Sequence, residues 1–259
     1  MFKLAVGLAW TSPFIWTRFT MTALNIRHPQ GWEVKWIQGD GWCPARRHMR
    51  ICEQALAWGA DVICMLGSDQ VYEPDILERM ATNFLAGYYF NCASVPARGY
   101  FAWNKEMRPF QPMAWRWKPV QPDGNGHVAM REYRGQALDG DMVEIVDLTQ
   151  GPRMLRVNFI GSGALMYGAE YLPLLKKPWF YETINQEDYT RQAIMDVLFV
   201  HRMQTEAGAQ LWLDRTIKIK HIHPFEIDET FQYRFDDWMV PGKGDPAIAI
   251  HGTVETAPR

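Results

Sequence analysis

The stretch that decides the fold is residues 59–79, GADVICMLGSDQVYEPDILER. Its five consecutive apolar residues, 62–66, are too few for a buried helix and predict a strand covered on both faces, as in a parallel sheet. The strand ends at Gly67, and a hydroxyl and a carboxylate follow directly on Ser68 and Asp69. Ligands of open α/β sheets usually bind at the carboxyl ends of the strands, so we expect a binding site here.

Helical patterns lie on both sides of this strand. On the carboxyl side, Glu-Pro-Asp at residues 73–75 suits the start of a helix, because proline fits the first turn and acids complement its positive end. Ile76, Leu77 and Met80 then fall on one apolar stripe. On the amino side, residues 46–58 predict a second helix with one apolar face. The unit is therefore helix, buried strand, polar loop and helix.

The rest of the chain continues this α/β pattern. Residues 3–10 predict the first strand and residues 32–38 the second, with a helix over residues 14–26 between them. Later segments predict strands over residues 88–94, 142–148, 155–160 and 216–220, a short helix over residues 171–177, and a longer helix that carries Asp196.

Between residue 98 and about residue 140 the hydrophobic periodicity is lost. Trp103, Trp115 and Trp117 are interleaved with basic residues there, and residues 121–127 form a turn cluster. We expect an irregular excursion (98–140) over the sheet, whose tryptophans either stack on the rings of a bound ligand or anchor the loop to the core. The last residues, 242–259, predict a loosely held tail.

Composition sets the outer limits. A chain of 259 residues with 47% apolar content can bury a substantial core, and one domain over residues 1–259 is expected. The net charge of −2, with both signs interspersed, gives no clear footprint for nucleic acid. No apolar run approaches the length of a membrane span. The four cysteines lack paired CxxC spacing, which indicates reduced thiols without a zinc site and a cytoplasmic setting.

Short motifs follow one another along the chain in a definite order. They are Ala45-Arg46-Arg47, residues 55–61, Leu66-Gly67-Ser68-Asp69, residues 74–77, Gly161-Ser162-Gly163, Pro178-Trp179-Phe180 and the segment from Asp196 to Asp214. Together they resemble GT-A glycosyltransferases, close to the family 2 type, over roughly residues 3–223. The resemblance implies an α/β fold of the GT-A (Rossmann-like) nucleotide-diphospho-sugar transferase type, with a central, mostly parallel sheet flanked by helices.

The activity that the resemblance implies is transfer of a sugar from a nucleoside diphosphate sugar, with a UDP-sugar favoured, to a hydroxyl group of an unknown acceptor. A divalent cation, Mn²⁺ or Mg²⁺, would bridge the donor diphosphate to the protein. Gly67 stands where the family's Asp-x-Asp metal motif has its first aspartate, so Asp69 is the only carboxylate of that motif in this chain.

The same resemblance implies a set of donor-binding residues. They are Thr11, Ser12, Arg46, Ser68, Asp69, Gly161, Ser162 and Gly163. A guanidinium at the start of a helix suits a diphosphate, and glycines allow a sugar to approach the backbone closely. Considered singly, each segment also fits a plainer interpretation: the turn after a strand, a solvated arginine or a tight glycine turn.

Two roles remain, the metal ligands and the general base. The resemblance implies Asp69 and His221 as metal ligands, with His223 on the same strand face as the rival. An acceptor hydroxyl needs a carboxylate that takes its proton as the oxygen attacks the anomeric carbon. The resemblance places this base at Asp196, because the residues after it match the family's spacing, and Asp188 is the alternative.

Other functions stay open on the sequence alone. Gly67 and Met195 stand where the family has acidic residues, which favours a protein that binds a nucleotide sugar without transferring it. A nucleotidyltransferase would need a glycine-rich phosphate loop after the first strand, and residues 10–16 carry none. The last possibility is an interaction module that uses its tryptophan-rich loop.

Overall fold

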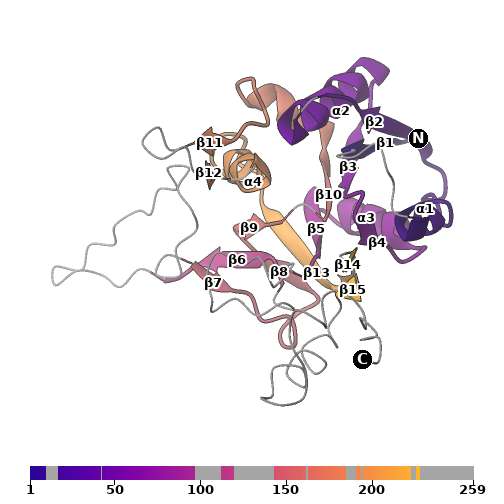
Figure 1. The fold of residues 1–259 in the computed structure, drawn as a ribbon. Coiled ribbons are helices and arrows are strands. Elements are labelled where there is room, and N and C mark those ends of the chain that lie inside the picture. The colour runs from indigo at the N-terminus through magenta and orange to yellow at the C-terminus, as the bar shows by residue number, and fades with distance from the viewer. Residues whose placement is uncertain are drawn as a thin grey trace, which may run out of the picture.

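In the computed structural model of the chain, the described residues are 1–9, 17–41, 43–96, 112–119, 143–161, 163–184, 191–193, 195–222 and 226–227. A seven-stranded sheet forms the centre (Figure 1). In spatial order its strands are β2 (Glu33–Gly39), β1 (Lys3–Ala9), β3 (Val62–Leu66), β10 (Ala164–Gly168), β5 (Phe90–Ser94), β13 (Leu211–Lys218) and β8 (Met154–Arg156). β10 and β8 run antiparallel to their neighbours, whereas the other five strands are mutually parallel. The predicted mostly parallel α/β sheet is therefore confirmed.

Helices pack on both faces of the central sheet (Figure 1). They are α1 (Thr17–Ala23), α2 (Pro44–Trp58), α3 (Ile76–Leu85), α4 (Met195–Thr205) and the 3-10 helix η2 (Ala169–Leu174). α2 and α4 contribute to one apolar cluster, and α1 and α3 contribute to a second. All of β3 is buried, and its side chains alternate between the two clusters. The strand predicted at the centre is thus covered on both faces.

Three small sheets lie beside the central one within the described residues. β4 (Gln70–Val71) pairs with β14 (Lys220–Ile222), which pairs with β15 (Glu226–Ile227). β6 (Ala114–Trp117) lies between β7 (Val143–Ile145) and β9 (Phe159–Ile160), and β11 (Thr183–Ile184) pairs with β12 (Arg191–Ala193). In the described ranges, no helix is long and apolar enough to cross a membrane.

Two predicted strands are divided in the structure. Residues 155–160 do not form one strand, because β8 belongs to the central sheet and β9 to a small one. The division falls at Val157 and Asn158, whose N–H groups donate to carbonyl groups of β13 and β6. Likewise, the strand predicted over residues 216–220 is the end of β13 and the start of β14, on either side of Ile219. In both places the chain changes sheet within two residues, and apolar patterning continues through the change.

Two further predictions need correction. The excursion is not irregular throughout, because Trp115 and Trp117 lie in β6 and pair with residues of β7. The helix predicted over residues 171–177 is instead the 3-10 helix Ala169–Leu174, which contains Pro173 and so lacks one N–H donor. Trp103, most of the excursion and the predicted tail over residues 242–259 lie outside the described residues.

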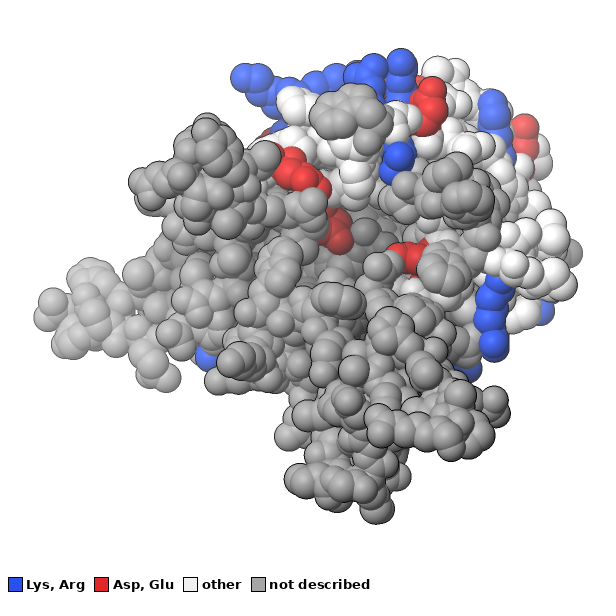
Figure 2. Space-filling view, in the orientation of Figure 1, with Lys and Arg blue, Asp and Glu red and all other residues white. Residues whose placement is uncertain are grey.

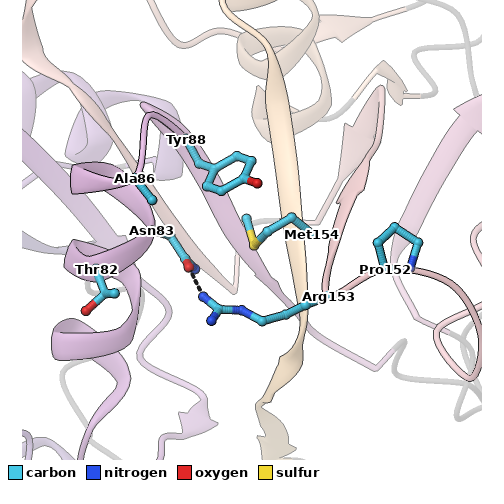
Figure 3. A pocket seen from close by; sticks show the side chains of 7 residues that line it. All are labelled: Thr82, Asn83, Ala86, Tyr88, Pro152, Arg153 and Met154. Carbon is cyan, nitrogen blue, oxygen red and sulfur yellow. Dashed lines mark hydrogen bonds between the residues drawn. The ribbon is translucent and has the colours of Figure 1, made fainter.

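Asp214 on β13 is fully buried and organises a polar cluster beside α3. Its carboxylate accepts hydrogen bonds from the Thr216 N–H (2.9 Å), the Thr216 hydroxyl (2.6 Å), Asn83 Nδ2 (3.0 Å) and Arg153 Nε (3.0 Å). Figure 3 shows Arg153 hydrogen-bonded to Asn83 beside a pocket of about 330 Å³ at the last turn of α3. Burial raises the pKa of the Asp214 carboxyl, but the hydrogen bonds and the Arg153 charge together outweigh burial and hold this pKa below its ordinary value of 3.8.

We expect Asp214→Asn to lower the free energy of unfolding at neutral pH by about 2 kcal/mol, because charge-assisted hydrogen bonds are lost. A carboxyl whose folded pKa is depressed stabilises the fold above its unfolded pKa, and this contribution disappears as the pH falls through the folded pKa. In urea unfolding, wild-type stability should therefore decline more steeply below about pH 4 than that of the variant. Asp40→Asn, at an exposed position, should keep the wild-type profile. Equal slopes for wild type and Asp214→Asn would contradict this account.

Candidate functional site

The topology brings several predicted residues to one edge of the central sheet, the edge at which the parallel strands end. β3 ends just before the loop that carries Asp69. α2 returns from β2 to β3, and α4 returns to the start of β13, so the first turns of both helices lie at this edge. β10 begins at the same edge, because its first residue pairs with the last residue of β3. Arg46, Asp69, Gly163 and Asp196 therefore share the carboxyl edge of the sheet.

The pairing of two short strands brings His221 to Asp69. β14 lies antiparallel to β4, with His221 opposite Gln70, and the N–H of Ile222 donates to the carbonyl of Asp69 at 2.7 Å. As a result, Nε2 of His221 lies 3.5 Å from Oδ2 of Asp69. The His221 side chain is only 9% exposed, whereas the Asp69 side chain is 29% exposed and accessible to a ligand. The two side chains implied as metal ligands thus meet, although they are far apart in the sequence.

The hydrogen bond at the other nitrogen of His221 shows how this pair suits a cation. Nδ1 lies 3.0 Å from the carbonyl oxygen of Pro96, which can only accept, so Nδ1 carries a hydrogen. In the neutral imidazole, Nε2 then has the lone pair and faces the Asp69 carboxylate. Metal-bound histidines commonly donate their other N–H to a carbonyl in this way, and a neutral imidazole beside carboxylate oxygens is a reasonable ligand for Mn²⁺. Asp69 and His221 therefore fit a divalent cation.

The ligand set is small when only acidic, thiol and imidazole side chains are counted. Within the part of the chain that the structure describes, no three His, Cys, Asp or Glu side chains are grouped so as to hold a metal ion. A cation held by Asp69 and His221 would therefore need further oxygen atoms, from a diphosphate, from water or from a neutral side chain.

Gly67 and Gly163 allow two chain segments to touch beside Asp69. The N–H of Gly67 donates to the carbonyl of Gly163 at 3.0 Å. A Cβ atom on Gly163 would overlap the Cγ2 methyl of Val95, and one on Gly67 would lie 2.9 Å from Cδ of Gln70. Packing therefore excludes a side chain at position 163 unless Val95 moves, and at position 67 the end of the Gln70 side chain fills the space that a Cβ atom would enter.

Asp196 is half-buried in the first turn of α4, where its Oδ1 accepts the N–H of Val197 at 2.9 Å. The first turns of α4 and α2 lie at the same edge of the sheet, and His48 follows Arg46 by two residues in α2. Burial lowers the pKa of His48, while the hydrogen bond to the Pro44 carbonyl and the negative charge of Asp196 oppose that shift. The two helices thus bring Asp196 to the end of α2 at which Arg46 lies.

Charge of both signs occurs around this edge. Figure 2 shows Lys and Arg side chains gathered along the upper edge of the view, on the side where α2 lies in Figure 1, and acidic side chains toward the middle. Arg46 in the first turn of α2 is exposed, and Ser68 is half-buried in the turn before Asp69. An anionic ligand at the carboxyl edge would therefore meet a guanidinium and the free N–H groups of a helix start.

Some predicted residues lie outside the described residues, and their roles stay predictions. They are Thr11, Ser12, Ser162, Asp188 and His223. Of the two candidate bases, only Asp196 is described, and of the two candidate metal ligands on the last strand, only His221 is described. The structure therefore compares neither pair directly.

Sequence reasoning missed Gln70 and Tyr72, which pack against Gly67 and Gly163. Both side chains are buried, at 4% and 3% exposure, whereas Val71 between them is half-buried. The polar and aromatic side chains at alternate positions after the buried strand indicated a shared inward face. This alternation was the signal in the sequence that could have identified Gln70 and Tyr72. It does not predict which residues their shared face contacts.

The sequence matches no protein-family profile and no curated protein. Among solved structures, the chain is similar to A197 from STIV, with 14% identity, a TM-score of 0.47 and 86% of each chain covered. It is also similar to S. aureus TarS 1–349, with 11% identity, a TM-score of 0.42, and coverage of 86% of this chain and 61% of that chain. A third similar structure is the nucleoside-diphosphate-sugar pyrophosphorylase from Vibrio cholerae RC9, with 10% identity, a TM-score of 0.30, and coverage of 70% and 60%.

Proposed function

We propose that the protein is a GT-A glycosyltransferase that moves a sugar from a nucleoside diphosphate sugar, a UDP-sugar being favoured, to an acceptor hydroxyl. The observation that carries this proposal is the meeting of Asp69 and His221 at the carboxyl edge of a mostly parallel sheet. A carboxylate and an imidazole at that edge suit a divalent cation, and open α/β sheets bind nucleotides there. The order of the motifs along the sequence supports the same class of donor.

In the proposed reaction, the acceptor oxygen attacks the anomeric carbon of the donor sugar. The new C–O bond forms as the bond from that carbon to the diphosphate oxygen breaks, and the electron pair leaves with the diphosphate. Asp196 takes the proton from the attacking hydroxyl. Arg46 and the free N–H groups at the start of α2 bind the diphosphate. When bound, the cation neutralises negative charge on the leaving group.

Titration calorimetry tests this proposal by measuring the affinity of a nucleoside diphosphate for the protein with and without Mn²⁺. We expect Mn²⁺ to strengthen binding of UDP or GDP to the wild type, and Asp69→Ala to reduce the Mn²⁺-dependent affinity by more than about tenfold. Binding without Mn²⁺ should change little, because Asp69 contacts the nucleotide through the cation. Asp75→Ala is the matched control, since Asp75 makes no side-chain capping bond at the start of α3.

The outcomes separate the proposal from its alternatives. Failure of the wild type to bind any nucleoside diphosphate would overturn the proposal. Mn²⁺-dependent binding without hydrolysis or transfer of any nucleotide sugar would instead favour the binding protein without turnover, which the glycine at position 67 and Met195 suggested.

A further inference from the structure

The hydroxyl of Tyr72 is surrounded by three oxygen atoms. Its Oη lies 2.8 Å from the carbonyl oxygen of Gly67, 2.9 Å from that of Gly163 and 2.7 Å from Oε1 of Gln70. Tyr72 is 3% exposed and Gln70 is 4% exposed, so water is largely excluded from this cluster. The cluster lies directly beside Asp69, because Gly67 and Gln70 flank the Ser68-Asp69 turn.

A phenolic hydroxyl has one hydrogen, and the two carbonyl groups can only accept. If Tyr72 donates its hydrogen to Oε1 of Gln70, then Oη also lies close to the carbonyl oxygens of Gly67 and Gly163 with no hydrogen between them. Rotating the Gln70 amide by half a turn removes one of them: Nε2 then donates to Tyr72 Oη, and the hydroxyl donates to one of the carbonyls. The two ends of an amide have the same shape, so the hydrogen bonds decide its orientation.

In this orientation the other end of the amide, now Oε1, occupies the space in front of Gly67. A Cβ atom on Gly67 would lie 2.8 Å from that terminal amide atom and 3.2 Å from Oδ1 of Asp69. The amide end and the Asp69 carboxylate therefore border the same small volume, into which a side chain at position 67 would project. Oδ2 of the same carboxylate lies 3.5 Å from Nε2 of His221.

We propose that the side-chain oxygen of Gln70 is the third protein ligand of the divalent cation and replaces the carboxylate missing at position 67. The inference rests on the proposed function, because it concerns the cation of that same site. Amide oxygens are regular ligands of hard cations such as Mg²⁺ and Mn²⁺. Tyr72 is a positioning residue, since its hydroxyl accepts from Nε2 and holds Oε1 toward Asp69 and His221.

The replacement has a chemical consequence for the site. An amide oxygen carries no formal charge, so the cation has one negative charge fewer around it than in an Asp-x-Asp site. We therefore expect Mn²⁺ to bind weakly alone and more tightly when a diphosphate supplies anionic oxygens. The glycine at position 67 is also consistent with Gln70 in this place, because an aspartate at position 67 would collide with the Gln70 amide.

The experiment measures the dissociation constant of Mn²⁺ from the free-ion signal in electron paramagnetic resonance, with and without UDP, which needs no turnover. We expect Gln70→Ala to weaken Mn²⁺ binding by about tenfold and Gln70→Glu, which keeps the shape and adds a charge, to strengthen it by about tenfold. Tyr72→Phe should weaken binding by a few fold, because the amide is then free to turn. Thermal unfolding in EDTA establishes that each variant is folded. If Gln70→Ala does not fold, the isosteric Gln70→Glu provides the test of Mn²⁺ binding in its place.

Three results would overturn the inference. If Gln70→Ala binds Mn²⁺ as the wild type does while Asp69→Ala does not, Gln70 is no ligand and the proposed function stands. If Gln70→Glu weakens Mn²⁺ binding, the side chain at position 70 supplies no oxygen to the cation. If the wild type binds no Mn²⁺ even with UDP, both this inference and the metal-assisted function fail.

Discussion

Gly163→Ala is expected to destabilise the protein by at least about 3 kcal/mol, at the upper end of the usual cost of overpacking a core. The added Cβ atom would overlap the Cγ2 methyl of Val95 and lie 2.9 Å from its Cβ. Val95 is 1% exposed and β-branched, so it has little freedom to move away. Urea unfolding at neutral pH measures the loss.

Gly168→Ala is the matched control, because Gly168 is the last residue of β10, the strand that begins directly after Gly163. There the three atoms nearest to the new methyl group all belong to the carboxylate end of the exposed Glu170, which can rotate into solvent. The control should stay within about 0.5 kcal/mol of wild type. Adding Val95→Ala to Gly163→Ala should recover part of the loss, since the two residues share one space. A Gly163→Ala variant as stable as the control would show that the segments before Ala164 and around Val95 do not pack as described.

Asp196→Asn is expected to lower kcat by about 10²- to 10⁴-fold, the usual contribution of a general base. The asparagine side chain keeps the size of aspartate but cannot take a proton from the acceptor hydroxyl. Nucleotide affinity with Mn²⁺ should stay near the wild-type value, because Asp69 and His221 are unchanged. Steady-state transfer or donor hydrolysis gives kcat, and calorimetry with UDP gives the affinity.

Asp188→Asn decides between the two predicted bases. If Asp196 is the base, Asp188→Asn should lose less than about tenfold in kcat. A large loss in Asp188→Asn with near wild-type turnover in Asp196→Asn would move the base to Asp188 and contradict the assignment to the start of α4.

The sequence predicted those parts of the fold in which the burial of apolar side chains determines the type of secondary structure. The apolar run before Gly67 predicted β3 and its coverage on both faces, because five apolar residues in succession are too few for a buried helix and suit a strand in a parallel sheet. The division at Val157 and Asn158 could not be predicted in this way. Apolar residues continue through that point, and the change of sheet is made by backbone hydrogen bonds to partners far away in the chain.

The residues of the candidate site also differ in how far the sequence could predict them. Asp69 and His221 could be proposed together because charged and ionisable side chains in motif order carry a recognisable chemical pattern. Gln70 and Tyr72 could not, because a neutral amide and a buried phenol acquire a role only through the two carbonyl groups that they contact. Similarly, Asp214 was noticed only as the end of a motif, whereas its partners Asn83 and Arg153 come from two other parts of the chain.

The antiparallel strand β10 has a consequence for how this protein can diversify. β5 ends and β10 begins at the same edge of the sheet, so the chain between them starts and finishes at that edge. Apart from β8 at the outer margin, this intervening chain adds no strand to the central sheet within the described residues. We expect changes of length within this segment to leave the pairing of β5 with β10 intact. Under the proposed function, this segment is therefore where acceptor recognition would diversify.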